Sequence, residues 1–111
     1  MKLNFRTKKL QKQCNDFKKC VKKFGKPCAE KIRARLDDLT DSPNLETMKL
    51  FPQARFHALT GDRNGQFALD VLHPKRLIIE PDHDPVPTLE DGSIDLKKVT
   101  QVTLVEITDY H

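Results

Sequence analysis

The chain has 111 residues, of which 37% are hydrophobic and 6% aromatic, so it can fill one modest core and we expect a single domain over 1–111. No run of about 18 apolar residues occurs and the N-terminal residues lack the apolar segment of a signal peptide, so we expect a cytoplasmic protein without a membrane span. The three cysteines have no CxxC spacing, which disfavours a disulfide framework and a zinc site and predicts small buried or half-buried thiols.

Charge is unevenly distributed along the chain. Residues 1–35 hold 13 lysines and arginines and 2 acidic residues, a net +11, whereas residues 36–111 hold 7 and 14, a net −7. A polycationic segment is typical of proteins that contact nucleic acid, because its side chains neutralise backbone phosphates and release counterions. The alternative is a lysine-rich face that only meets solvent, and charge by itself does not decide between the two.

The first third of the chain predicts a short strand and two helices. Alternating apolar residues in "KLNFR" indicate the strand. From residue 8 the apolar residues recur every three or four positions, which predicts one amphipathic helix that ends at Gly25. A second helix is expected from Pro27 to about Thr40, and the short linker predicts an antiparallel helical hairpin.

The first expected helix carries thiols and lysines. Cys14 and Cys20 are six residues apart, which is about 240° around a helix, so we expect them on different faces. The faces away from the apolar stripe carry lysines, and these are candidates for RNA contact: Lys8, Lys12, Lys19, Lys22 and Lys23.

Beyond Pro52 the periodicity changes to two, which predicts strands. The stretches "ARFHALT", "QFALDVL" and "KRLIIE" should form an antiparallel meander, and "VTQVTLVEIT" a last strand. Before the last strand, a proline-rich acidic loop is expected at about 81–98. The element order β-α-α-β-β-β-β predicts an α+β fold, with the helical hairpin packed on one face of a small antiparallel β-sheet.

Five polar residues could carry chemistry. His57 interrupts an apolar strand, Arg63 lies in the turn after it, Arg76 begins the next strand, and the chain ends on Tyr110 and His111. Taken singly, each is more commonly a surface residue. Together they match metal-free RNA cleavage, in which a base removes the 2′-hydroxyl proton, an acid protonates the leaving 5′-oxygen, and a guanidinium stabilises the phosphorane.

That chemistry requires no cofactor, and we expect none. The acidic loop contains Asp82, His83 and Asp84, but these have no rigid second element to complete a coordination shell, so we expect no metal site.

Several motifs resemble, in order, the HigB toxins of the RelE/ParE superfamily. They are "FHALTGDRNGQFALDV", the strand "KRLII" and the final "EITDYH", and the similarity extends to the initial F-R and to "LDDLTDSPNLETM". The resemblance implies a RelE-like fold and the toxin of a type II toxin–antitoxin system, a plasmid maintenance killer protein. Such a toxin is a ribosome-dependent endoribonuclease, or mRNA interferase. The implied partners are the ribosome with its mRNA and a HigA-like helix-turn-helix antitoxin, assembled as a homodimer or a toxin–antitoxin heterotetramer.

The resemblance also implies residue roles. His57 corresponds to the family's strand histidine, Arg76 to its phosphate-stabilising arginine, and Tyr110 and His111 to its C-terminal catalytic pair. Asp109 would orient or tune His111.

The chain departs from the family pattern at two places. Thr60 stands where members commonly have a lysine, so either Arg63 or Arg76 covers that cation's role or cleavage is weakened. The loop at 81–98 is longer than the tight turn of compact members.

Two alternatives stay open. One is a ParE-like inhibitor of DNA gyrase, a binding protein without hydrolytic residues, against which the Asp-Tyr-His ending counts. The other is a catalytically weak homologue that mainly binds an antitoxin, of the kind sometimes labelled killer suppression protein.

Overall fold

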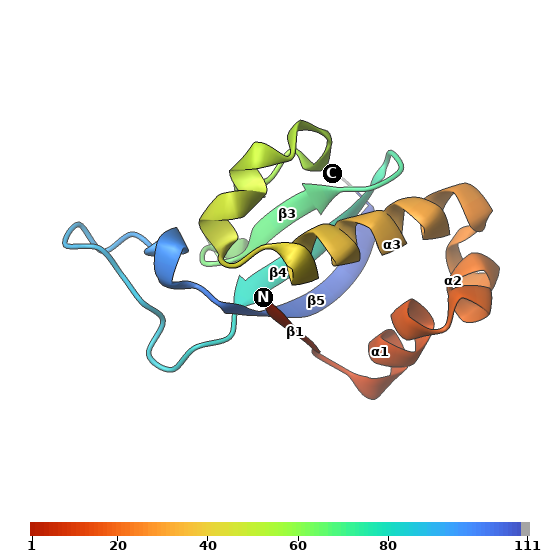
Figure 1. The fold of residues 1–111 in the computed structure, drawn as a ribbon, viewed down its shortest axis with the longest axis horizontal. Helices are drawn as coiled ribbons and strands as arrows, with labels where there is room; N and C mark the ends of the chain where they lie inside the picture. Colours follow the sequence, from red (N-terminus) through yellow and green to blue (C-terminus); the bar gives the residue numbers. More distant parts are fainter. Residues whose placement is uncertain (110–111) are drawn as a thin grey trace.

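The computed structural model describes residues 1–109, which form an α+β fold in which a 16-residue helix lies across one face of a five-stranded sheet (Figure 1). The strands are β1 (Lys2–Phe5), β2 (His57–Ala58), β3 (Phe67–Asp70), β4 (Lys75–Pro81) and β5 (Gln101–Asp109). The helices are α1 (Lys8–Asn15), α2 (Phe17–Phe24) and α3 (Lys26–Asp41). Four short 3₁₀ helices connect them: η1 (Leu45–Leu50), η2 (Pro52–Ala54), η3 (Gly61–Arg63) and η4 (Leu96–Lys98). Within residues 1–109 no helix is both long and apolar enough to cross a bilayer.

The sheet is mixed, with strand order β1-β5-β4-β3-β2. The expected antiparallel meander is confirmed for β2 to β5, but β1 pairs parallel with β5, from Lys2 opposite Gln101 to Phe5 opposite Leu104. The expectation of a wholly antiparallel sheet is therefore wrong at this edge. A parallel pair needs a long crossover connection, and every other element of the chain lies between these two strands.

Asp16 divides the first expected helix in two. Its extended backbone ends α1, where its N–H donates to the Lys12 carbonyl (3.1 Å), and its Oδ1 caps α2 by accepting from the N–H groups of Lys18 (3.0 Å) and Lys19 (3.3 Å). The prediction of one continuous helix to residue 24 is wrong because this side chain offers the backbone a better partner than the next helical carbonyl.

The break brings the thiols together. Cys14, Cys20 and Cys28 are all buried and unbridged in one core cluster, which confirms the expected buried thiols. The expectation that Cys14 and Cys20 lie on separate faces is overturned, because it assumed an unbroken helix. Burial raises the pKa of Cys14 to about 11, with a further contribution from the neighbouring Cys20.

Helix α3 supplies the largest part of the core on the helical side of the sheet. Its Ala29, Ile32, Leu36 and Leu39 are fully buried, in a cluster that also contains Leu69, Leu77, Ile79 and Leu104 from the strands. Apolar residues at this spacing form one helical stripe, which fixes the helix against the sheet.

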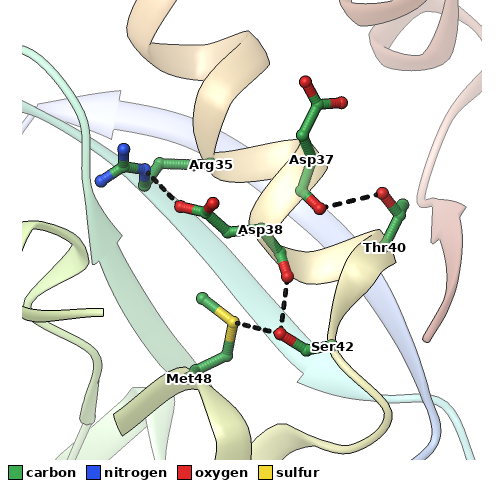
Figure 2. A network of polar contacts seen from close by, with 6 residues as sticks. All are labelled: Arg35, Asp37, Asp38, Thr40, Ser42 and Met48. Carbon is green, nitrogen blue, oxygen red and sulfur yellow. Dashed lines mark hydrogen bonds and ion pairs between the residues drawn. The ribbon is translucent and has the colours of Figure 1, made fainter. Parts of the chain in front are cut away.

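Polar contacts close the end of α3, as Figure 2 shows. Ser42 Oγ donates to the Asp38 carbonyl (2.6 Å) and lies 3.5 Å from Met48 Sδ, so it ties the last turn to η1. The Met1 ammonium donates to the carbonyls of Leu39 (3.2 Å) and Thr40 (2.9 Å). A cation at this position complements the negative end of the helix dipole.

The acidic loop is a structured segment between β4 and β5. Asp82 accepts from Asn4 Nδ2 (2.5 Å), and His83 Nε2 accepts from the backbone N–H groups of Thr100 (3.0 Å) and Gln101 (3.3 Å). Further along, Thr88 pairs with Ile94. The loop lies at one end of the long axis of the molecule, and α1 and α2 lie at the other (Figure 1).

Candidate functional site

The candidate site lies on the sheet face that points away from α3, which we call the polar face. Leu69 and Leu77 point into the helical core, so strand alternation places Asp70 and Arg76 on the opposite face. Register agrees, since Asp70 pairs with Arg76 and Arg76 with Thr108, and residues directly opposite share a face.

A bulge in β5 shapes this face. Ile78 pairs with Glu106 whereas Ile79 pairs with Leu104, so Val105 is the extra residue. Val105 and Ile78 are buried there with Ala68, in a small apolar cluster separate from the main core. The bulge therefore lets one strand supply both an apolar floor and the carboxylate of Glu106.

His57 is held in one orientation by the backbone before it. Its Nδ1 lies 2.8 Å from the carbonyl oxygen of Arg55, and a carbonyl can only accept, so Nδ1 carries the proton. Arg55 adopts the left-handed conformation (φ 46°, ψ 47°) at the end of η2, as no other non-glycine residue within 1–109 does. In neutral His57 the lone pair is consequently on Nε2.

Arg76 meets that lone pair. Its Nη1 lies 3.4 Å from His57 Nε2, and its Nε lies 3.6 Å from Asp70 Oδ1. The second oxygen of Asp70 lies 3.5 Å from Arg55 Nε, so one carboxylate holds two guanidinium groups beside the imidazole. Asp70 and Arg55 were not among the residues expected from sequence.

Arg63 lies on the polar face but in a different set of contacts. Its Nη2 lies 3.0 Å from Glu106 Oε2 and its Nη1 donates to Gln66 Oε1 (2.9 Å). Within residues 1–109 it has no hydrogen bond or ion pair with His57 or Arg76. Thr60 is exposed at the N-cap of η3, where its side chain makes no capping hydrogen bond. The cation that reaches His57 is therefore Arg76.

Asp109 ends β5 in an ion pair. Its Oδ1 lies 2.5 Å from Nζ of Lys75, the residue opposite it in the register. The expected catalytic residues Tyr110 and His111 lie outside the described residues, and the expected role of Asp109 towards His111 stays a prediction.

The five candidate lysines on α1 and α2 are all exposed: Lys8, Lys12, Lys19, Lys22 and Lys23. In the described part of the chain none of them forms an ion pair. This basic surface and the β3–β4 turn lie towards the same end of the molecule (Figure 1).

Residues 1–109 contain no group of three or more His, Cys, Asp or Glu side chains arranged to hold a metal ion. In the loop, Asp82 and His83 are engaged instead in the hydrogen bonds that anchor it to β5 and β1.

Comparison with known proteins identifies the fold. No family model matches the sequence, and no curated protein sequence matches it. The structure is similar to that of a YoeB/ParE toxin from Agrobacterium tumefaciens, with a TM-score of 0.54 and 13% sequence identity over 100% of both chains. The chain therefore has the fold of a YoeB/ParE-type toxin, and the expected α+β class is confirmed.

Proposed function

We propose that this chain is the toxin of a type II toxin–antitoxin system and cleaves mRNA on the ribosome. The observation that carries the proposal is the pair of His57 and Arg76, in which an imidazole nitrogen with a fixed lone pair faces a guanidinium at 3.4 Å. The toxin fold and the motif resemblance to HigB support the same reading.

In the proposed reaction His57 is the general base. Nε2 takes the proton of a ribose 2′-hydroxyl, the 2′-oxygen attacks the adjacent phosphorus, and the bond to the 5′-oxygen breaks, leaving a 2′,3′-cyclic phosphate and a 5′-hydroxyl. Arg76 stabilises the phosphorane with two N–H donors that stay charged. Asp70 positions the guanidinium, since its contact is to Nε. We assign protonation of the leaving oxygen to the C-terminal pair Tyr110 and His111, as the resemblance implies.

Supporting roles follow the contacts. Arg63, held by Glu106, would meet the RNA strand further along the polar face. Thr60 in place of the family's lysine leaves Arg76 as the cation closest to the base, and we expect this to give slower cleavage, not its absence.

The basic surface on α1 and α2 would bind ribosomal RNA. Exposed lysines give a sequence-independent, salt-sensitive attraction to phosphates, so codon choice would come from the ribosome and messenger. We further propose a cytoplasmic protein neutralised by a HigA-like helix-turn-helix antitoxin, in a homodimeric or heterotetrameric complex.

Two other functions fit the fold. The similar structure carries ParE in its name, which supports inhibition of DNA gyrase as the second candidate. A catalytically weak antitoxin-binding homologue is the third, and Thr60 is the observation that favours it.

The test compares wild type with His57→Ala, Arg76→Lys and the distant control Lys98→Ala. Arg76→Lys keeps the charge but loses the planar fork, so we expect single-turnover cleavage of ribosome-bound messenger to fall about a hundredfold, while Lys98→Ala cleaves like wild type. In growing cells that express His57→Ala, mapping of messenger 5′ ends on ribosomes should find no ends produced by cleavage. Growth arrest with DNA damage and no such ends would instead support the gyrase inhibitor.

A further inference from the structure

A second cationic feature adjoins the His57–Arg76 pair at the turn between β3 and β4. A hollow of about 200 Å³ is lined there by Arg55, Asp70, His73, Lys75 and Arg76, with Val71 and Pro74 completing its wall. A water molecule occupies about 30 Å³ in the liquid, so the space accommodates a phosphate group and part of its hydration shell. Arg76 belongs both to this hollow and to the contact with His57.

Some hydrogen-bond donors that line the hollow already have partners in the described part of the protein, and others do not. Lys75 is paired with Asp109, and Asp70 lies against the Nε atoms of both arginines. Arg55 has a side chain 77% exposed, its ion pair with Asp70 is through Nε, and among residues 1–109 its terminal Nη1 and Nη2 atoms donate no hydrogen bond. His73 is exposed, and its ring likewise has no hydrogen bond among residues 1–109. A planar guanidinium whose terminal nitrogens remain available suits a phosphate, which it can bind through two parallel N–H donors.

We propose that this hollow binds the phosphodiester next to the scissile one, held by Arg55 and His73. The proposal rests on the function proposed above. Phosphates follow one another along an RNA strand, so a strand with its scissile phosphate at Arg76 places a neighbouring phosphate within reach of the adjoining hollow. Asp70 then sets the spacing of the two phosphate sites, because one of its carboxylate oxygens binds Arg55 and the other binds Arg76.

Arg55 also orients His57 through its backbone, and the test must separate these roles. Asparagine tolerates the left-handed conformation, so Arg55→Asn removes the guanidinium while the carbonyl that accepts from His57 stays in place. His73→Ala removes the second ligand without touching that backbone. Lys98→Ala, in η4 before the start of β5, is the matched control for the loss of one exposed cation.

The experiment combines these variants with messengers that carry one neutral methylphosphonate linkage, either 5′ or 3′ of the cleaved bond. Cleavage by the full-length protein is measured on programmed ribosomes as kcat/KM. For wild type we expect the neutral linkage at one of the two positions to lower kcat/KM about tenfold, the size of one lost hydrogen bond to a charged group. Arg55→Asn should lower kcat/KM by a similar factor on the unmodified messenger. For this variant, the neutral linkage at the same position should cause no further decrease in kcat/KM.

The proposal is overturned if the losses in kcat/KM caused by Arg55→Asn and by the neutral linkage add in full at both positions. It is also overturned if neither neutral linkage lowers the kcat/KM of wild type. An equal loss in Lys98→Ala would reduce the effect to overall charge and overturn it too. A wild type that leaves every messenger intact would instead refute the proposed nuclease function, so the two failures are distinguishable.

Discussion

At the scale of single residues, the buried thiols make stability depend on pH. Burial raises the pKa of Cys14 from 9.0 to about 11, and it also raises those of Cys20 and Cys28. The unfolded chain therefore loses these protons at a lower pH than the folded chain. The stabilisation is complete below pH 9 and is lost as the pH rises towards 11.

We expect the free energy of unfolding to fall above pH 9, with Cys14 alone contributing a slope of about 1.4 kcal/mol per pH unit. Urea unfolding between pH 7 and pH 10.5 measures this slope. In Cys14→Ala the overall stability will be lower but the slope shallower, which isolates the thiol from lysines that titrate in the same range. Parallel pH profiles for the two proteins would contradict the assignment.

The candidate site shows which residues a sequence can reveal. The sequence predicts His57 and Arg76 as site residues, because a histidine interrupts an apolar strand, an arginine begins a later one, and both match the motifs of the resemblance. Asp70 and Arg55 were missed for physical reasons. The role of Asp70 arises from the cross-strand register that sets it opposite Arg76, and that of Arg55 from a left-handed backbone, and neither is encoded in a local residue pattern.

At the scale of elements, Asp16 shows how one side chain overrides a helical period. The apolar stripe continues across it unchanged, so periodicity predicted a single helix, while the capping hydrogen bonds begin a second one. The parallel partner of β1 was missed for a related reason. An alternating pattern identifies a strand but carries no information about which strand lies beside it or in which direction.

Asp16→Ala should destabilise the fold by about 1 kcal/mol, because α2 loses its N-cap. The matched control is Asn15→Ala, an exposed change at the last residue of α1 that we expect to alter stability by less than about 0.5 kcal/mol. Urea unfolding at neutral pH measures both. Equal midpoints for the two variants would mean that the cap contributes nothing to the break.

At the scale of the whole molecule, the basic surface should govern association with the ribosome. We expect the triple variant Lys19→Glu, Lys22→Glu and Lys23→Glu to bind ribosomes much more weakly than wild type, and its affinity to depend less steeply on salt. Sedimentation binding at several salt concentrations measures both quantities. The control is Lys97→Glu with Lys98→Glu, a charge reversal in η4. If the triple variant binds ribosomes as tightly as wild type, these three lysines only meet solvent and do not contact the ribosome.

The separation of charge along the 44 Å long axis also makes the molecule an electric dipole. Its positive pole lies at α1 and α2, and its negative pole at the loop that carries Asp82, Asp84, Glu90, Asp91 and Asp95 (Figure 1). In the field of a polyanion such a molecule experiences a torque as well as an attraction, so it turns its basic end forward before contact. The β3–β4 turn, at that same end, would then arrive first, and the acidic loop would trail on the side facing solvent.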